Sequence, residues 1–336
     1  MIRNREVLEM DFIPFRVVCR DGQIKALVNN LKPVIEGGKP RNSFLFGPTG
    51  TGKTCIARYV LEEFSKETGA FASYINCWRV RTRFNILYEL SRDLGMGLSF
   101  HRKGTPVDEI ALALERRLEE KPCVLVLDEV DQIEETDVIY DLLTLPNMCL
   151  IMISNNPHAF YKMDPRIMSR LASTERIEFP VYRKEEIVSI LRDRVEWGLF
   201  PGVISIPQLE KIAETSSGDA RVAIEILRIC AEEAERRDLN RITDDVIARF
   251  TSSIFNPKLE SRFSMLNPYQ KLIINILKQE GEMTSGKLFK KLNEICRNEG
   301  LQPVVDRTFR KYTSSLLKSG FISVKRKGKN RIYDFI

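Results

Sequence analysis

Residues 43–54 read SFLFGPTGTGKT, a short strand-like run followed by a glycine-rich loop. The loop, residues 47–54, matches the pattern GxxxxGK[ST], and an amphipathic helix is expected to begin near Cys55. In a strand–loop–helix unit of this kind, glycines let backbone N–H groups converge on phosphates at the positive end of the helix. The stretch therefore predicts a nucleotide-binding P-loop within an α/β domain.

Each polar residue of this loop has an expected task. Lys53 would neutralise charge on the β- and γ-phosphates of ATP or ADP, and the Thr54 hydroxyl would ligate Mg²⁺. The predicted nucleotide-binding residues are Gly47, Pro48, Thr49, Gly50, Thr51, Gly52, Lys53, Thr54 and Cys55.

A second chemical pattern follows an apolar run at residues 124–129, which read VLVLDE. Open α/β sheets bind their ligands at the carboxyl ends of strands, where Asp128 and Glu129 would lie. We expect Asp128 to hold the water shell of the metal and Glu129 to polarise the water that attacks the γ-phosphate. The acids from Asp131 onward are typical of a solvated loop.

The surrounding sequence indicates a parallel sheet. Short apolar runs alternate with amphipathic helical patterns up to residue 180, which is the pattern of a sheet with helices on both faces. Strands are expected at residues 43–46, 71–76, 124–127, 150–154 and 175–179. We therefore predict that residues 1–180 form one α/β nucleotide-binding domain.

The strand patterns stop after residue 180. Helices are expected at residues 184–195, 207–215, 220–236 and 243–251, which predicts a small helical lid domain over residues 181–255. Residues 252–267, with Pro257 as a breaker, are expected to be a hinge to a third domain, residues 260–336.

Charge is divided unevenly along the chain. Residues 260–336 hold sixteen Lys or Arg against seven Asp or Glu, whereas residues 1–259 hold 36 against 39. The whole basic excess, +9 in a chain of net charge +6, belongs to the C-terminal part. A polyanion is expected to dock there.

The C-terminal pattern is helix, helix, helix and two strands, which predicts a winged helix. The third helix, expected at residues 304–318, carries an apolar stripe that should pack inward: Val305, Phe309, Tyr312 and Leu316. The third helix should enter the major groove, and the basic hairpin tip should contact the adjacent backbone. The residues expected to contact DNA are Arg307, Arg310, Lys311, Lys325, Arg326, Lys327, Lys329 and Arg331.

Three further patterns are weak when taken singly. Asn155 follows a strand and is a common turn former, Arg166 and Arg170 lie in a Pro-Arg-x-x-Ser-Arg box, and Asp219 and Arg221 open a helix after a glycine. In this order and spacing, with the P-loop and the Asp-Glu strand end, they resemble the archaeal origin-recognition and cell-division-cycle initiator family of AAA+ ATPases. The resemblance covers nearly the whole chain.

The resemblance implies roles for these residues. Asn155 would be sensor 1, at the γ-phosphate or the attacking water, and Arg221 would be sensor 2, reaching the γ-phosphate from the lid. Arg170 would be the arginine finger offered to a neighbouring subunit, with Arg166 the competing candidate. A helix within residues 78–94 is where a further DNA contact would lie.

The resemblance also implies an ATP-regulated replication initiator that binds double-stranded origin DNA and helps recruit the replicative helicase. It further implies slow, switch-like hydrolysis and other initiator subunits as partners. Two alternatives stay open: an ATPase of the same architecture serving transcription or a mobile element, and a DNA-binding paralogue with little turnover. The sequence shows neither a secretory signal nor a membrane span, and its seven cysteines form no CxxC pair. We expect a cytoplasmic, nucleoid-associated protein with reduced thiols and without zinc.

Overall fold

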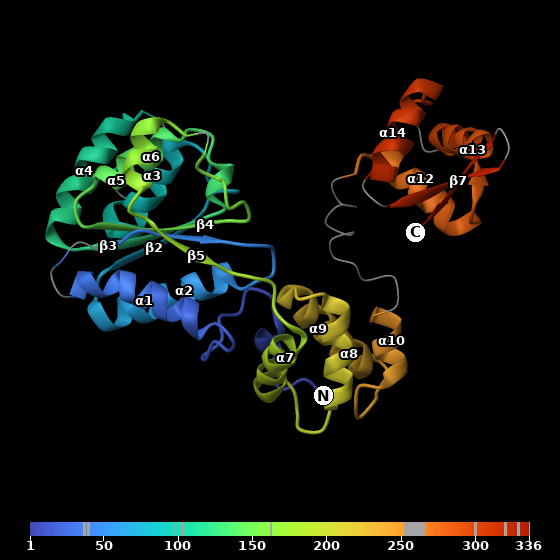
Figure 1. Cartoon of the computed structure of the whole chain (residues 1–336), viewed down its shortest axis with the longest axis horizontal. Helices are drawn as coiled ribbons and strands as arrows, with labels where there is room; N and C mark the ends of the chain where they lie inside the picture. The colour runs from blue at the N-terminus through green and yellow to red at the C-terminus, as the bar shows by residue number, and fades with distance from the viewer. Residues whose placement is uncertain are drawn as a thin grey trace. The chain divides into compact units, whose positions relative to one another are not determined.

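The computed structural model describes residues 1–35, 38, 41–97, 99–101, 104–161, 163–251, 266–298, 301–318, 321–327 and 330–335. The chain divides into two compact units, Met1–Thr251 and Ser252–Ile336 (Figure 1). Most of the expected hinge, residues 252–265, lies outside the described residues. None of the described helices is long and apolar enough to cross a membrane.

The first unit begins with an α/β part and continues into a helical lid. Its elements in chain order are α1 (Asp21–Ile35), β1 (Ser43–Phe46), α2 (Lys53–Thr68), β2 (Phe71–Asn76), α3 (Arg83–Ser91), α4 (Val107–Glu120), β3 (Cys123–Asp128), α5 (Asp137–Thr144), β4 (Met148–Ser154), α6 (Pro165–Leu171), β5 (Glu175–Glu178), α7 (Lys184–Gly198), α8 (Ile206–Ser216), α9 (Ala220–Arg236) and α10 (Asp244–Thr251).

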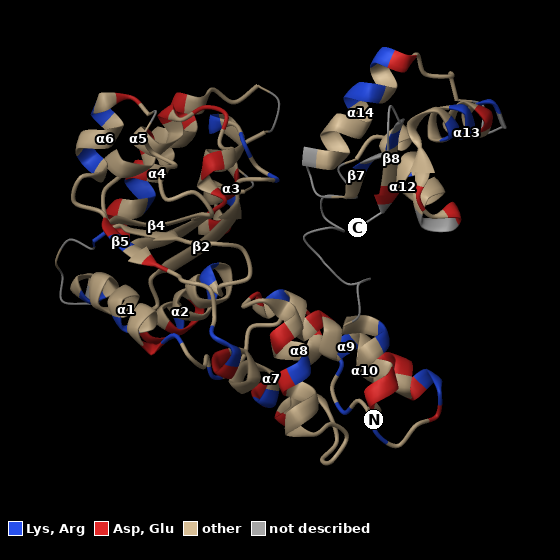
Figure 2. Ribbon diagram, turned by 45° about the vertical axis from the view of Figure 1, so that its right-hand side comes forward, with Lys and Arg blue, Asp and Glu red and all other residues tan. Residues whose placement is uncertain are grey.

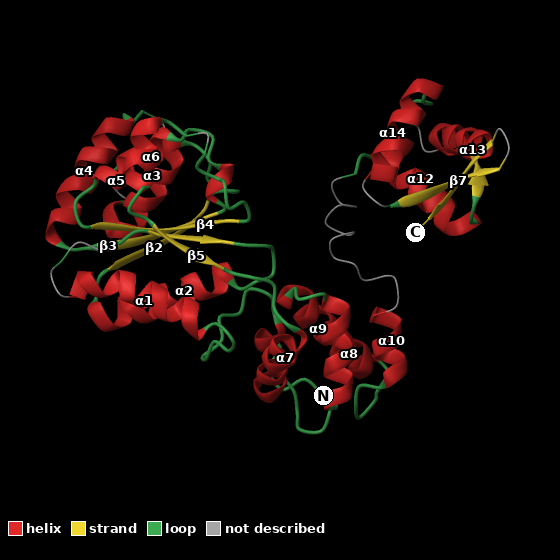
Figure 3. Cartoon of the chain, viewed as in Figure 1, coloured by secondary structure: helices red, strands yellow, loops and turns green. Residues whose placement is uncertain are grey.

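The five strands form one parallel sheet in the order β2-β3-β4-β1-β5. Helices cover both faces of the sheet (Figure 3). Because side chains alternate along a strand, Val124 and Val126 of β3 pack with α1 and α2, whereas Leu125 and Leu127 pack with the cluster on the other face. The predicted parallel α/β fold is confirmed.

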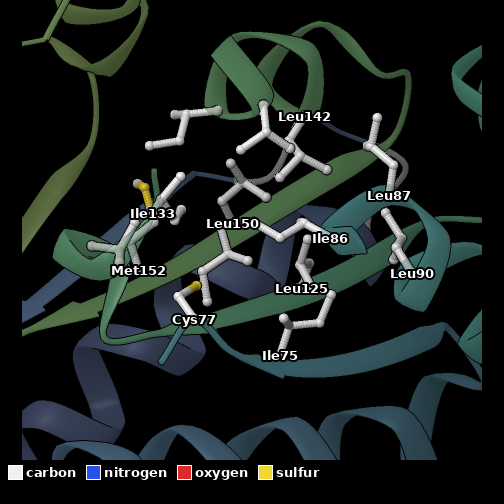
Figure 4. Close-up of a cluster of buried hydrophobic side chains, with 14 of the residues drawn as sticks. Ile75, Cys77, Ile86, Leu87, Leu90, Leu125, Ile133, Leu142, Leu150 and Met152 are labelled. Carbon is white, nitrogen blue, oxygen red and sulfur yellow. The ribbon is translucent and has the colours of Figure 1, made fainter. Parts of the chain in front are cut away.

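The larger hydrophobic cluster lies between the sheet and helices α3 to α6. It joins strand residues such as Leu125, Leu150 and Met152 to helix residues such as Ile86 and Leu142 (Figure 4). All five of these side chains are fully buried. This packed layer fixes the carboxyl ends of β3 and β4, where polar residues follow.

The second unit contains a three-helix core and a small antiparallel sheet. Its elements are α12 (Pro268–Glu280), β6 (Met283–Thr284), α13 (Ser285–Asn298), α14 (Asp306–Lys318), β7 (Ile322–Lys327) and β8 (Asn330–Phe335), with the strand order β6-β8-β7. The short strand β6 was not predicted. The winged-helix order of helices and strands is confirmed.

One core prediction in this unit is wrong. Phe309 and Leu316 are buried as expected, but the Val305 side chain is 67% exposed. The helix begins at Asp306, two residues later than expected, and the Val305 carbonyl accepts the amides of Thr308 and Phe309. Val305 therefore precedes the helix, and the helical spacing that defines the inward stripe does not apply to it.

Candidate nucleotide site and DNA-binding surface

The P-loop connects β1 to the first turn of α2. Gly50 and Gly52 have φ values of 71° and 90°, a backbone conformation that residues other than glycine rarely adopt. The Lys53 ammonium donates to the carbonyl oxygens of Gly47, at 2.7 Å, and Pro48, at 2.6 Å. Lys53 therefore lies within the concave face of the loop, where phosphates bind in proteins with this motif.

The environment of Lys53 lowers the pKa of its ammonium group. Burial lowers the pKa of the Lys53 ammonium to about 8, and repulsion from Arg221 adds to this. The carboxylates of Asp128 and Asp219 act in the opposite direction. A bound polyphosphate would favour the charged ammonium, because an opposite charge at close range raises the pKa of a lysine.

Asp128 is the last residue of β3 and is only 4% exposed. Its Oδ2 accepts two hydroxyl groups, that of Thr54 at 2.8 Å and that of Tyr74 at 2.7 Å. Thr54 and Asp128, which the sequence predicts as a metal pair, are thus brought into direct contact. Their oxygen atoms are the ligand type that Mg²⁺ prefers.

Glu129 follows directly in a left-handed conformation, with φ 57° and ψ 47°. Such a conformation costs a non-glycine residue about 1 kcal/mol or more, and this kind of strain gathers at functional sites. Burial raises the pKa of the Glu129 carboxyl, and the charges of Asp128 and Asp131 raise it further. The backbone turn thus holds a carboxylate of increased basicity beside the P-loop.

A single pocket collects these residues with others from distant parts of the chain. The predicted residues that line it are Thr49, Gly50, Thr51, Gly52, Lys53, Thr54, Cys55, Asp128, Glu129, Asn155 and Arg221. Asn155 lies exposed directly after β4. Gly47 and Pro48 do not appear in the lining but hold the Lys53 ammonium through their carbonyl oxygens.

The lid contacts the P-loop directly at the start of α9. Asp219 is the N-cap, accepting the amides of Arg221 and Val222, and the Ala220 amide donates to the Gly50 carbonyl at 3.0 Å. A Cβ atom on Gly50 would lie 1.8 Å from Asp219 Oδ1. The lid therefore packs on the P-loop at a point that only glycine leaves open, and Arg221 enters the pocket from this contact.

Sequence reasoning missed the part of the pocket formed by the N-terminal segment. Lining residues there include Phe12 and Val17, and Ile190 and Ile224 of the lid line the same pocket. Arg194 of α7 donates to the carbonyls of Val7 and Phe12 and is buried. No sequence motif marks this part of the pocket. An arginine on the inward face of an amphipathic helix nevertheless indicates that the arginine has a buried partner.

Arg20 connects three segments of the chain. Its guanidinium donates to the carbonyls of Thr51 in the P-loop and Pro180 after β5, and its carbon centre lies 3.9 Å from the Tyr182 ring centroid. The buried cation thus fastens the P-loop to the start of the lid.

The two finger candidates lie outside the pocket. Arg166 makes a two-point contact with Asp164, at 3.1 Å and 3.2 Å. Arg170 stacks on the Tyr140 ring, 4.8 Å from its centroid, and donates to the Tyr140 hydroxyl. Both side chains are exposed.

The arginines of the stretch 78–94 are largely engaged. Arg83 makes a two-point contact with Asp141, and Arg92 pairs with Glu89. Arg81 stacks on the Trp78 ring at 4.7 Å. Most of the positive charge in this stretch, where the resemblance implies a DNA contact, is therefore partnered within the chain.

The winged-helix unit presents cations along its helices (Figure 2). Arg307, Arg310 and Lys311 are exposed on α14, although Arg310 pairs with Asp306 at 2.7 Å. Lys325 and Arg331 are exposed on the two strands of the wing. Lys329 and the side chains of Arg326 and Lys327 lie outside the described residues.

A parallel sheet of order β2-β3-β4-β1-β5, a P-loop and a helical lid that packs on it define an AAA+ ATPase. The family model of the AAA ATPase domain matches residues 16–153, that of the Cdc6 AAA+ ATPase-type lid domain matches residues 188–251, and that of the CDC6 C-terminal winged-helix domain matches residues 271–335.

Named relatives agree with these matches. The chain is 34% identical to the ORC1-type DNA replication protein 9 of Halobacterium salinarum, over all of this chain and 94% of that protein. It is 38% identical to the ORC1-type DNA replication protein 1 of the same organism, over 86% of this chain and 94% of the relative. The chain belongs to the ORC1/Cdc6 family of DNA replication proteins.

Solved structures agree as well. The Orc1 protein of Aeropyrum pernix, solved in complex with DNA, superposes with a TM-score of 0.74 at 26% identity, over 99% of this chain and 93% of that one. Cdc6p of Pyrobaculum aerophilum superposes with a TM-score of 0.68 at 25% identity, over 99% and 94%. The predicted family and fold class are confirmed.

Proposed function

We propose that this chain is a replication initiator that binds duplex DNA at an origin, under the control of bound ATP or ADP, and helps to recruit the replicative helicase. The observation that carries the proposal is the lid contact on the P-loop. Because the Ala220 amide is bonded to Gly50, Arg221 lies in the same pocket as Lys53. The presence of a third phosphate can therefore change the position of the lid.

Within this proposal the pocket residues divide the chemistry. Lys53 and the P-loop amides bind the phosphates, Arg221 senses the γ-phosphate from the lid, and Asn155 orients the attacking water. Glu129, with its raised pKa, accepts a proton from that water. Hydrolysis then acts as a slow switch between two lid positions, since losing the γ-phosphate removes the partner of Arg221.

The magnesium ion would be held by Thr54 and, through water, by Asp128, whose oxygen atoms lie 2.8 Å apart. When bound, Mg²⁺ neutralises charge on the phosphate oxygens. The remaining contribution of the chain is to keep both oxygen atoms in place before the nucleotide arrives.

The geometry favours Arg170 as the finger offered to a neighbouring initiator subunit. Asp164 neutralises Arg166 through two hydrogen bonds, whereas the contacts of Arg170 found among the described residues are with the neutral Tyr140. An uncompensated cation interacts more strongly with a γ-phosphate than one already paired with a carboxylate.

For DNA, we propose that α14 enters the major groove and that Lys325 and Arg331 of the wing contact phosphates. The A. pernix relative was solved in complex with DNA, and the same unit of this chain exposes five of its expected contact residues. Recognition of duplex DNA by a basic helix and hairpin follows the general pattern of helix-turn-helix proteins.

Genome-wide mapping of the sites bound by the full-length protein tests the proposed function. An initiator concentrates at one or a few positions, and these coincide with the maxima of a replication profile. The purified chain should bind the mapped fragment differently in ATP and in ADP. Sites spread over many promoters, away from any replication maximum, would contradict the proposal.

A further inference from the structure

Tyr74 lies beside the proposed metal pair and has no role in the chemistry described so far. It belongs to β2, which pairs with β3 so that Asn76, two residues beyond Tyr74, is level with Asp128. The Tyr74 hydroxyl donates to Asp128 Oδ2 at 2.7 Å, the same oxygen that accepts the Thr54 hydroxyl at 2.8 Å.

Two donors on one oxygen fix the rotation of a carboxylate. Oδ2 is engaged by Thr54 and Tyr74, while no hydrogen bond to Oδ1 is found among the described residues. Asp128 lines the nucleotide pocket and is almost fully buried. The arrangement therefore leaves one oxygen of a preoriented carboxylate available to the pocket.

We infer that Tyr74 is a positioning residue for the magnesium site: its hydroxyl holds the Asp128 carboxylate in the orientation that receives the hydrated ion. The inference rests on the proposed ATP and Mg²⁺ binding and deepens it. Partners that orient metal-binding carboxylates in this way change metal affinity by about 10- to 100-fold when removed.

The chemistry of tyrosine suits the task. A phenol hydroxyl is neutral at physiological pH and can donate a hydrogen bond to a carboxylate, as the Tyr74 hydroxyl does to Asp128. Arg58, which also lines the pocket, lies 5.4 Å from the Tyr74 ring centroid. A neutral donor orients the carboxylate without cancelling the negative charge that attracts Mg²⁺.

A simpler role for Tyr74 would be to satisfy a buried carboxylate and nothing more. That role and the inferred one differ in what Mg²⁺ does. Loss of a purely structural bond would weaken nucleotide binding equally with and without the ion. Loss of a positioning bond changes the Mg²⁺ dependence itself.

The test compares the full-length wild type with Tyr74→Phe, using a fluorescent N-methylanthraniloyl derivative of ATP titrated in EDTA and at graded MgCl₂. Tyr74→Phe should raise the Mg²⁺ concentration for half-maximal tight binding about 10-fold and leave binding in EDTA unchanged. Tyr59→Phe is the matched control, because Tyr59 packs on the same core cluster and is not among the described lining residues.

A second arm keeps the inference falsifiable if the substitution loosens the fold. In an Asp128→Asn background, Tyr74→Phe should cause no further change in Mg²⁺ dependence, since the residue acts through that carboxylate. An unchanged Mg²⁺ dependence in Tyr74→Phe, or an equal loss of affinity in EDTA, would overturn the inference while the proposed function stands. A wild type that binds no nucleotide would overturn both.

Discussion

The proposed nucleotide pocket and the proposed DNA-binding surface of the winged helix would bind anions by opposite physical means. In the pocket, Lys53 and Asp128 are buried; Lys53 donates short hydrogen bonds to backbone carbonyls, and Asp128 accepts short hydrogen bonds from two hydroxyl groups. On the winged helix, Arg307 and Lys311 stand exposed on α14. One site is preorganised before its ligand arrives, whereas the other presents charge to a long polyanion. Single substitutions should therefore have large effects in the pocket and small, salt-dependent effects on the winged helix.

The largest effect should come from Glu129→Gln. Removing a general base lowers a rate by about 100- to 10,000-fold, and the amide keeps the shape of the side chain. Single-turnover hydrolysis of ATP should fall in this range while nucleotide affinity is kept. Glu134→Gln, the same change in an exposed side chain five residues along, is the control. A variant that still hydrolyses ATP at the wild-type rate would remove Glu129 from the mechanism.

Lys53→Ala should have the next largest effect. Loss of a buried ammonium that contacts phosphate costs about 3 kcal/mol, or about 100-fold in affinity. ATP affinity, measured by calorimetry, should fall by this factor, with duplex DNA affinity unchanged at constant salt. Lys66→Ala, on the exposed side of α2 where Lys66 pairs with Glu63, should alter neither. A parallel loss of DNA binding would show that the two sites are not separable.

The pH dependence of ATP binding follows from the same lysine. The free pocket holds Lys53 with a pKa of about 8, and bound phosphates favour its protonated form. Affinity should thus be constant below about pH 8 and fall by up to about tenfold per unit above it, because binding then requires proton uptake. In Lys53→Arg the affinity should show no such fall. A wild-type affinity that is flat to pH 10 would contradict the lowered pKa.

Arg307→Ala should give the smallest effect. One lost phosphate contact lowers the slope of log affinity against log salt by about 0.9, which amounts to a few-fold loss at physiological salt. Arg310→Ala should cost less, because Asp306 already partners that guanidinium. Fluorescence anisotropy of a labelled duplex over a salt series measures both, and Lys211→Ala in the lid is the control. Equal effects of the two arginine substitutions would show that the ion pair opens freely on DNA.

The sequence predicted what depends on local pattern. The expected strands lie within one or two residues of β1 to β5. Among these, β1, β3 and β4 are recognisable because buried parallel strands are almost continuously apolar. The strand order was not predicted, because it is set by contacts between segments far apart in the chain. Val305 shows the limit for helices: the helix starts two residues later than expected, and Val305 therefore lies on the surface and not in the core.

The same division applies to the candidate site. Lys53 and Thr54 were predicted from the spacing of the P-loop motif and Asp128 from its place at the end of an apolar run, and the structure brings the three together. Tyr74 and Arg194 were not identified, since their partners lie 54 residues or more away along the chain. A tyrosine in a strand has no local feature that distinguishes a carboxylate partner from an ordinary core position.

The contact between Gly50 and Asp219 has a consequence for how such chains can evolve. The carboxylate of Asp219 takes up the volume that any side chain at position 50 would need, and the two residues belong to different parts of the molecule. Neither position can change alone, because a larger residue at position 50 requires a smaller residue at position 219. Across descendants of this sequence, substitutions at these two positions should therefore be inherited as a pair.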